Sequence, residues 1–230
     1  MKKNVIGMVF TILVLVFVII GLIGSWYTSH MKISSGTMDM ESDSNIYLTR
    51  MDGKSVMAGQ TSEQSVELSD IREQYEAAGM DTSFIDAIGN VFIITIIALI
   101  FTIIALVFAV TSIFKPKLQM IGGIFAIIVF ILVLLAPILF MTGFSSYLEA
   151  QTELYGTTAG EANMGFWYSV SEGGSETSMG PGYAWYLMII GAIFALIAGI
   201  MLFIKQKQAL PTPHAVPMQP QTPPVNPPTQ

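Results

Sequence analysis

The sequence predicts an all-α membrane protein, in which a four-transmembrane-helix bundle carries a small extracellular antiparallel β-sheet. The 230-residue chain is 53% hydrophobic and only 11% charged, whereas soluble domains carry about 25% charged residues. Four apolar runs contain no Asp, Glu, Lys, Arg or His, and each is long enough for a bilayer-crossing helix of ~20 residues. These runs are residues 5–24, 89–113, 121–141 and 183–204. Alternating and turn-forming residues between the first two runs favour strands.

The first apolar run follows Lys2 and Lys3, a pattern that it shares with cleaved signal peptides. The apolar part of a signal peptide is usually ~7–15 residues long and ends at an A-x-A-like cleavage site. Here the run is longer and ends in GLIGSWY, which offers no such site. We therefore expect residues 1–24 to remain as the N-terminus and the first span.

A short basic loop sets the expected orientation of the spans. FKPKLQM, residues 114–120, carries Lys115 and Lys117 around Pro116, which ends a helix. Short loops rich in Lys and Arg stay in the cytoplasm. We therefore expect this turn and both termini of a multi-pass plasma-membrane protein to be cytoplasmic. The exterior then holds all sixteen acidic residues and four of the ten basic ones, a net charge of −12.

The first extracellular segment, residues 25–88, contains most of the strand signals. WYTSHMKIS and TMDMESDSNIYLT are typical of strands, and the second alternates acidic positions with Met and Ile positions. Asp52–Gly53 suits a two-residue turn with positive φ at both positions, so we expect a hairpin turn there. SDIREQYEAAG predicts a short amphipathic helix that begins at Ser69 and ends at Gly79.

The second extracellular segment, residues 142–182, is shorter and more mixed. SSYLEAQTEL is expected to continue the third span as a helix, and NMGFWYSVS to form a strand that joins the sheet of the first segment. GGSETSMGPG predicts a flexible loop before the fourth span. The second span is expected to begin near Phe84, beyond the lipid. Residues 205–230 are rich in proline and predict a disordered cytoplasmic tail.

Two groups of residues are expected to position the spans. Trp and Tyr favour the lipid headgroup layer, and a belt at the outer interface is predicted for Trp26, Tyr27, Tyr183, Trp185 and Tyr186. Small residues on one helix face let a neighbouring helix approach closely. Two such stripes are expected to pack helices within the bundle or, alternatively, to mediate self-association: Gly191, Ala195 and Gly199, and Ala98 and Ala105.

The sequence predicts no catalytic, cofactor or metal site. The chain has no cysteine, so disulfides and thiolate metal sites are impossible. A calcium loop that began at Asp39 would need Gly and Glu where Ser44 and Arg50 stand, so we expect this acidic run to be the solvated face of a strand. A weak surface cation site is the alternative for the same run. His30 and His214 have no spaced His, Glu or Asp partner on a predicted element. Because there is also no nucleophile elbow and no Walker loop, we expect no enzyme activity.

The arrangement of the chain resembles the claudin and peripheral-myelin-protein superfamily. The shared features are four spans with both ends inside, a longer first outer segment with most of a small sheet, and a short basic inner turn. The resemblance covers the organisation of residues 1–204. That family's first-loop signature combines tryptophans, one of them in a Gly-Leu-Trp sequence, with two cysteines. Of these residues, this chain has only an early tryptophan, Trp26. The missing cysteines imply a distant relative.

The predicted function is action by contact, because ionisable residues that would mark an ion or proton path are absent from the spans. An adhesion, scaffold or accessory-subunit role is expected, in which the acidic extracellular sheet meets a protein partner or a second copy. Membrane lipid is the other expected partner, and nucleic acid is not expected. The alternative is a small-solute channel or transporter subunit. A water-filled cavity lined by Asn90, Thr95 and Thr102 would favour that alternative, whereas a dry apolar bundle would favour contact.

Overall fold

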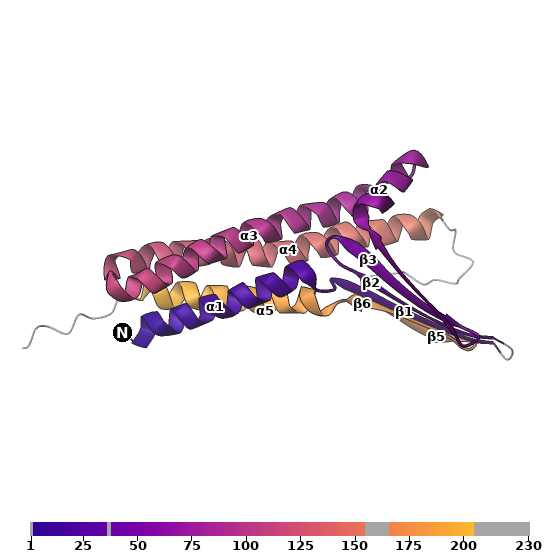
Figure 1. Cartoon of the computed structure of the whole chain (residues 1–230), viewed down its shortest axis with the longest axis horizontal. Helices are drawn as coiled ribbons and strands as arrows, with labels where there is room; N and C mark the ends of the chain where they lie inside the picture. Colours follow the sequence, from indigo (N-terminus) through magenta and orange to yellow (C-terminus); the bar gives the residue numbers. More distant parts are fainter. Residues whose placement is uncertain (1, 36–37, 155–165, 205–230) are drawn as a thin grey trace, which may run out of the picture.

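Four long helices form a bundle that carries a six-stranded antiparallel sheet at one end (Figure 1). The computed structural model describes residues 2–35, 38–154 and 166–204. The long helices are α1 (Lys2–Ile23), α3 (Ser83–Phe114), α4 (Gln119–Leu154) and α5 (Tyr183–Phe203). The start of α1 and the turn between α3 and α4 lie at the end of the bundle opposite the sheet (Figure 1).

All four helices are long and apolar enough to cross a membrane. Two are longer than one crossing requires, since α3 has 32 residues and α4 has 36, against ~20 for a single span. Both excess lengths lie at the sheet end, because α3 begins at Ser83 and α4 continues to Leu154. The predictions that the second long helix begins near Phe84 and that SSYLEAQTEL prolongs the third long helix are therefore confirmed.

Each long helix packs against two antiparallel neighbours, and the bundle closes in the order α1, α3, α4, α5. Large apolar side chains fill the interior and also cover the outside, where Ile93 and Ile193 are about half exposed. A helix that is apolar on all sides is typical of a membrane span. Each helix contributes fully buried side chains to the interior, among them Val14, Val91, Val133 and Met188.

The sheet combines residues from both segments that lie between the long helices. Its strands are β1 (Tyr27–Ser35), β2 (Met38–Ile46), β3 (Arg50–Met57), β4 (Gln60–Glu67), β5 (Tyr168–Glu172) and β6 (Ser175–Pro181). They lie in the order β4-β3-β2-β1-β6-β5, and all neighbours are antiparallel. The prediction that both segments share one sheet is therefore confirmed.

The predicted hairpin turn at Asp52–Gly53 is wrong, because both residues lie inside β3. The Asp52 carboxylate accepts hydrogen bonds from the Ser65 hydroxyl on β4 (2.6 Å) and from Arg50 Nε (3.2 Å). These bonds hold Asp52 in the strand and lower the pKa of its carboxyl, with Ser65 as the largest cause. The turn lies instead at Ala58–Gly59, where the φ angles are 51° and 79°. The structure therefore contains a two-residue turn with positive φ at both positions, but Ala58–Gly59 forms it instead of Asp52–Gly53.

The predicted loop GGSETSMGPG is wrong as well. Gly173 and Gly174 form a tight turn with φ angles of 59° and 86°, and the residues that follow are strand β6, which pairs with β1. The sequence pattern of β6 is polar, and its pairing with a central strand supplies the backbone hydrogen bonds that hold it extended. The predicted strand NMGFWYSVS begins only at Tyr168 and forms the edge strand β5.

The remaining local predictions concern two short elements. Helix α2 (Leu68–Ala77) begins one residue before Ser69, and Gly79 follows it with a φ of 67°. The basic connection FKPKLQM contains a single turn of 3-10 helix, η1 (Pro116–Leu118), so it is a tight turn as expected. The predicted tail, residues 205–230, lies outside the described residues.

The sheet joins the bundle where two backbone segments cross. The chain leaves α1 through Ser25 and Trp26 and returns to α5 through Gly182. The Gly182 N–H donates to the carbonyl of Trp26 (2.8 Å), and the Ala184 N–H donates to that of Ser25 (3.0 Å). Trp26 is fully buried here, and its indole N–H donates to the carbonyl of Gly21 (2.5 Å). The approach is so close that a Cβ at Gly182 would overlap the backbone of Ser25.

Gly182→Ala is therefore expected to destabilise the protein, because the new methyl group meets backbone atoms rather than a side chain that can rotate away. Overpacking of this kind costs about 1–3 kcal/mol, which corresponds to a fall in Tm of at least about 2 °C. Thermal unfolding of the full chain in detergent micelles measures the effect. Gly53→Ala is the control, since nothing lies within 4 Å of its added Cβ. Equal losses in both variants would contradict the steric explanation.

Candidate functional site

The five residues predicted to form an aromatic belt at the outer interface differ in how deeply they are buried in the protein. Trp26, Tyr27 and Trp185 are buried inside the protein, with 0%, 2% and 9% of their surface exposed. Only Tyr183 and Tyr186 lie on the surface, at 55% and 46% exposure. The prediction rested on the nearness of these residues to the apolar runs in the sequence. Whether each ring faces the protein interior depends on the helices and strands that pack beside it.

The buried rings form an aromatic cluster between the base of the sheet and the end of the bundle. The ring of Tyr27 on β1 lies 4.2 Å from that of Phe144 on α4, measured between centroids, and the ring of Trp26 lies 5.3 Å from that of Phe140. Phe166 contacts Tyr27 from the other segment, at 5.4 Å. Each such contact contributes about 0.5–1.5 kcal/mol beyond its buried area. The cluster thus holds the first residues of the sheet on the bundle. Burial in this cluster raises the pKa of the Tyr27 hydroxyl to about 12.

The predicted small-residue stripes lie at contacts between helices of the same chain. Gly199 of α5 leaves room for Ile127 of α4, and Gly191 of α5 lies against Phe17 of α1. A Cβ at either glycine would press on those neighbours. The predicted alanines are buried as well, with at most 1% of their surface exposed: Ala98, Ala105 and Ala195.

The sheet has two chemically different faces, because successive side chains along a strand point to opposite sides. The registers place most of the ionisable residues of the strands on one side, which we call the charged face. It bears His30, Lys32, Asp39, Glu41, Asp43, Arg50, Asp52, Lys54, Glu63, Glu67 and Glu176. The other side, which we call the Ser/Met face, bears Met31, Ile33, Ser42, Ser44, Ser55, Val66 and Met179. The alternation predicted for the second strand is therefore confirmed.

A row of alternating charges crosses four strands of the charged face. It runs from His30 on β1 through Asp43 on β2 and Lys54 on β3 to Glu63 on β4. His30 Nδ1 lies 2.6 Å from an oxygen of Asp43, and Lys54 Nζ lies 3.6 Å from Glu63. Exposed ion pairs contribute at most about 1 kcal/mol each. The row therefore determines the chemistry of the surface more than the stability of the fold.

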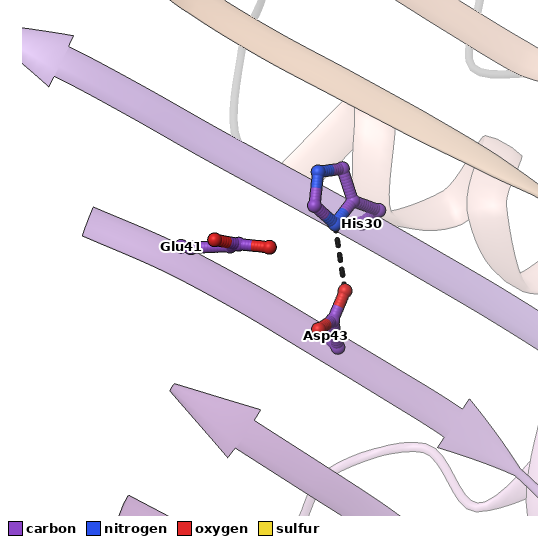
Figure 2. A group of neighbouring side chains, drawn as sticks. All are labelled: His30, Glu41 and Asp43. Carbon is purple, nitrogen blue, oxygen red and sulfur yellow. Dashed lines mark hydrogen bonds and ion pairs between the residues drawn. The ribbon is translucent and has the colours of Figure 1, made fainter. Parts of the chain in front are cut away.

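His30, Glu41 and Asp43 form a compact group on this face. Figure 2 shows Glu41 and Asp43 on one strand and His30 on its neighbour, with the His30–Asp43 contact marked by a dashed line. One nitrogen of His30 and one oxygen from each carboxylate all lie within 4.8 Å of one another. The side chains of His30 and Asp43 are 39% and 43% exposed, so solvent reaches the group.

The acidic surroundings raise the pKa of His30 above its ordinary value of 6.5. The largest cause is the hydrogen bond to Asp43. Desolvation, the next largest cause, acts in the opposite direction, and the charges of Asp43, Glu41 and Glu176 add to the upward shift. A raised histidine pKa means that the folded state binds the proton more tightly than the unfolded chain does. The contribution of the pair to folding is therefore fully present below pH 6.5 and is lost as the pH rises through the raised pKa.

Sequence reasoning missed the partner of His30. It considered acids spaced along one element, whereas Asp43 lies directly opposite His30 on the neighbouring strand. The usable signal was the alternation of acids in the second strand, which places Glu41 and Asp43 on one face. Only the register of β1 against β2 decides which of these acids meets the histidine.

The described part of the bundle interior has little free space. A cavity of about 10 Å³ lies beside Thr102, which is roughly the space for one water molecule. Thr95 and Thr102 are fully buried, and each donates its hydroxyl hydrogen to a carbonyl one turn earlier in α3, at 2.7 and 2.6 Å. Asn90 does not join them, because it lines an open groove of about 560 Å³ beside α2, at the sheet end.

A comparison of the sequence with protein-family models and with characterised proteins finds no match.

The pKa of His30 is expected to exceed 6.5 in the wild-type protein and to fall toward that value in Asp43→Asn, since the hydrogen bond to Asp43 is the largest cause of the shift. An NMR titration of the histidine ring protons measures it. The full chain contains only two histidines, and His30→Gln assigns the signal.

Glu63→Gln is the control for this titration. It removes a carboxylate from the same face, but one that is not among the groups acting on His30, so the His30 pKa should stay raised. A wild-type value at or below 6.5 would contradict the geometry of the pair.

Proposed function

We propose that this protein is an integral plasma-membrane protein that acts through protein–protein contacts at its sheet, as an adhesion molecule, scaffold or accessory subunit. The observation that carries the proposal is the sheet itself, which projects from the end of the bundle as a single layer (Figure 1). Among the described helices, α2 packs against it at β4. In antiparallel sheets, one face is commonly packed against a hydrophobic core and the other faces solvent. Here side chains on both faces remain accessible beyond the base, and a partner can cover them.

The two edges of the sheet offer a further means of contact. Strands β4 and β5 form these edges, and every residue of β4 except Val66 is exposed. An edge strand presents unpaired backbone N–H and C=O groups, which can pair with an extended segment of another chain. Such pairing supports binding of a protein partner or of a second copy.

The distribution of charge favours a basic partner. The charged face bears seven carboxylates and three permanently basic side chains: Asp39, Glu41, Asp43, Asp52, Glu63, Glu67 and Glu176, and Lys32, Arg50 and Lys54. An excess of one sign attracts the opposite sign over roughly one Debye length, about 8 Å at physiological salt. Partner binding through this face should therefore weaken as salt is added.

The bundle gives less support to a channel. Thr95 and Thr102, which would line a polar path, bond within their own helix, and Asn90 lies outside the interior. A packed apolar interior with a cavity of about 10 Å³ provides no room for a hydrated solute in a single copy. The contact function is therefore the better supported of the two.

The arrangement of the segments also supports a distant relationship to the claudin and peripheral-myelin-protein superfamily. The first segment supplies four strands and the second supplies two, and Lys115 and Lys117 lie in the turn at the opposite end of the bundle. Because short basic loops stay in the cytoplasm, we place the sheet outside the cell and both termini in the cytoplasm.

This orientation predicts which lysines a membrane-impermeant amine reagent labels on intact cells. Lys32 and Lys54 of the sheet should react, whereas Lys115 and Lys117 should react only after the membrane is permeabilised. Mass spectrometry of the labelled peptides measures both groups in the same sample, so each serves as the control for the other. Labelling of Lys115 and Lys117 on intact cells would reverse the orientation.

The contact function predicts a stoichiometric partner, or a second copy, that stays bound in mild detergent at low salt. Glu41→Gln with Glu63→Gln should reduce its retention by severalfold, because the pair of changes removes attraction from the charged face. Mass spectrometry of the purified full-length protein measures the ratio of partner to bait. A protein that is monomeric and alone under these conditions would contradict the proposal.

Asp70→Asn with Glu73→Gln is the matched control. It removes the same charge from α2, which lies beside the sheet but not on it, and should leave the amount of retained partner unchanged.

Solute release from loaded liposomes that contain the wild-type protein tests the alternative function, a channel or transporter subunit. Release that depends on the protein would favour the channel.

A further inference from the structure

The sheet brings together a nitrogen and two carboxylate oxygens that no single segment of the sequence combines. His30 on β1 lies directly opposite Asp43 on β2, and Glu41 lies two residues from Asp43 on the same face. We propose that His30, Glu41 and Asp43 bind a divalent transition-metal ion, for which Zn²⁺ is the best-suited probe. This site is additional to the contact function and does not depend on it.

The spacing of the donor atoms is close to what zinc requires. Zinc bonds to histidine nitrogen and carboxylate oxygen are about 2.0–2.2 Å long and tetrahedrally arranged, so two ligand atoms of one ion lie about 3.5 Å apart. One donor atom from each of the three residues already lies within 4.8 Å of the others. The side chains of His30 and Asp43 are partly exposed, so small rotations about their side-chain bonds can close the remaining distance.

The donor set also favours zinc over calcium or magnesium. Imidazole nitrogen suits zinc, copper and nickel, whereas calcium and magnesium prefer oxygen ligands throughout. Three protein ligands with a water molecule in the fourth position is a common zinc arrangement. Because the group is open to solvent, water can occupy that position. The chain has no cysteine, so no thiolate in the same protein competes for the ion.

The surrounding charges leave the group acidic. Lys54 lies opposite Asp43, but its ammonium pairs with Glu63 at 3.6 Å. Lys32 lies opposite Glu41 on one side and Glu176 on the other, so one lysine faces two carboxylates. The charges that act on His30 are those of Asp43, Glu41 and Glu176. A divalent cation would replace the proton that His30 shares with Asp43 and neutralise both carboxylates.

Isothermal titration calorimetry, in which Zn²⁺ is added to the untagged full-length protein, measures the stoichiometry and affinity of zinc binding and tests the proposal. We expect one ion per chain with a dissociation constant on the order of 10 µM, and Ca²⁺ should bind far more weakly. His30→Ala and Asp43→Asn should each weaken zinc binding at least about tenfold. In the wild-type protein, NMR should show zinc shifting the His30 ring signals while the His214 signals stay in place.

Asp39→Asn is the matched control, because it removes a carboxylate from the same strand and the same face without removing a proposed ligand. Its affinity for zinc should stay within about twofold of wild type. Equal weakening by Asp39→Asn and Asp43→Asn would show general attraction to an acidic surface, and would overturn the site. Saturable binding that survives His30→Ala, or no saturable binding below about 1 mM, would overturn it as well. Unchanged thermal unfolding of the zinc-free variants separates loss of a ligand from loss of the fold.

Discussion

The crossing of residues 25–26 with residues 182–184 is the constraint on which the rest of the structure depends. Residues 25–26 follow α1, and residues 182–184 lie at the start of α5. Backbone hydrogen bonds join these two segments, which are far apart in the sequence. Gly182 permits the approach because it has no side chain, and Trp26 fills the adjoining space. The contact between α1 and α5 in the bundle and the pairing of β1 with β6 in the sheet both follow from this crossing.

The sheet extends to both sides of β1 and β6. Connections on one side add β2, β3 and β4, and a tight turn on the other side adds β5. Because side chains alternate with a period of two, a slip of one residue would move every side chain to the opposite face. At the base of the sheet, the crossing fixes the register of β1 against β6, and the Trp26 N–H, which donates to the carbonyl of Ile46 (2.8 Å), fixes that of β1 against β2. These contacts therefore also determine that the carboxylates gather on one face and that His30 meets Asp43.

Bundle and sheet differ in the chemistry that they offer. The described interior of the bundle is apolar, and its buried threonine hydroxyls are satisfied within their own helix. Ionisable groups are instead concentrated on the strands that project from the bundle and on the neighbouring α2, where solvent and other molecules reach them. This separation is the reason that both the contact function and the metal site are assigned to the sheet.

The sequence by itself determined the features that depend on local composition. These are the four apolar helices, the proline-containing turn, the short helix before Gly79 and the alternation of acids along the second strand. Only the tertiary structure decided that Asp52 stays inside a strand, that Trp26 is buried inside the protein, and that His30 faces Asp43. Hydropathy and periodicity are properties of neighbouring residues in the chain, whereas turn position, ring burial and cross-strand pairing depend on the register between distant segments. In this protein that register is set where the backbone of Trp26 bonds to Gly182 on one side and to Ile46 on the other, which no local pattern reveals.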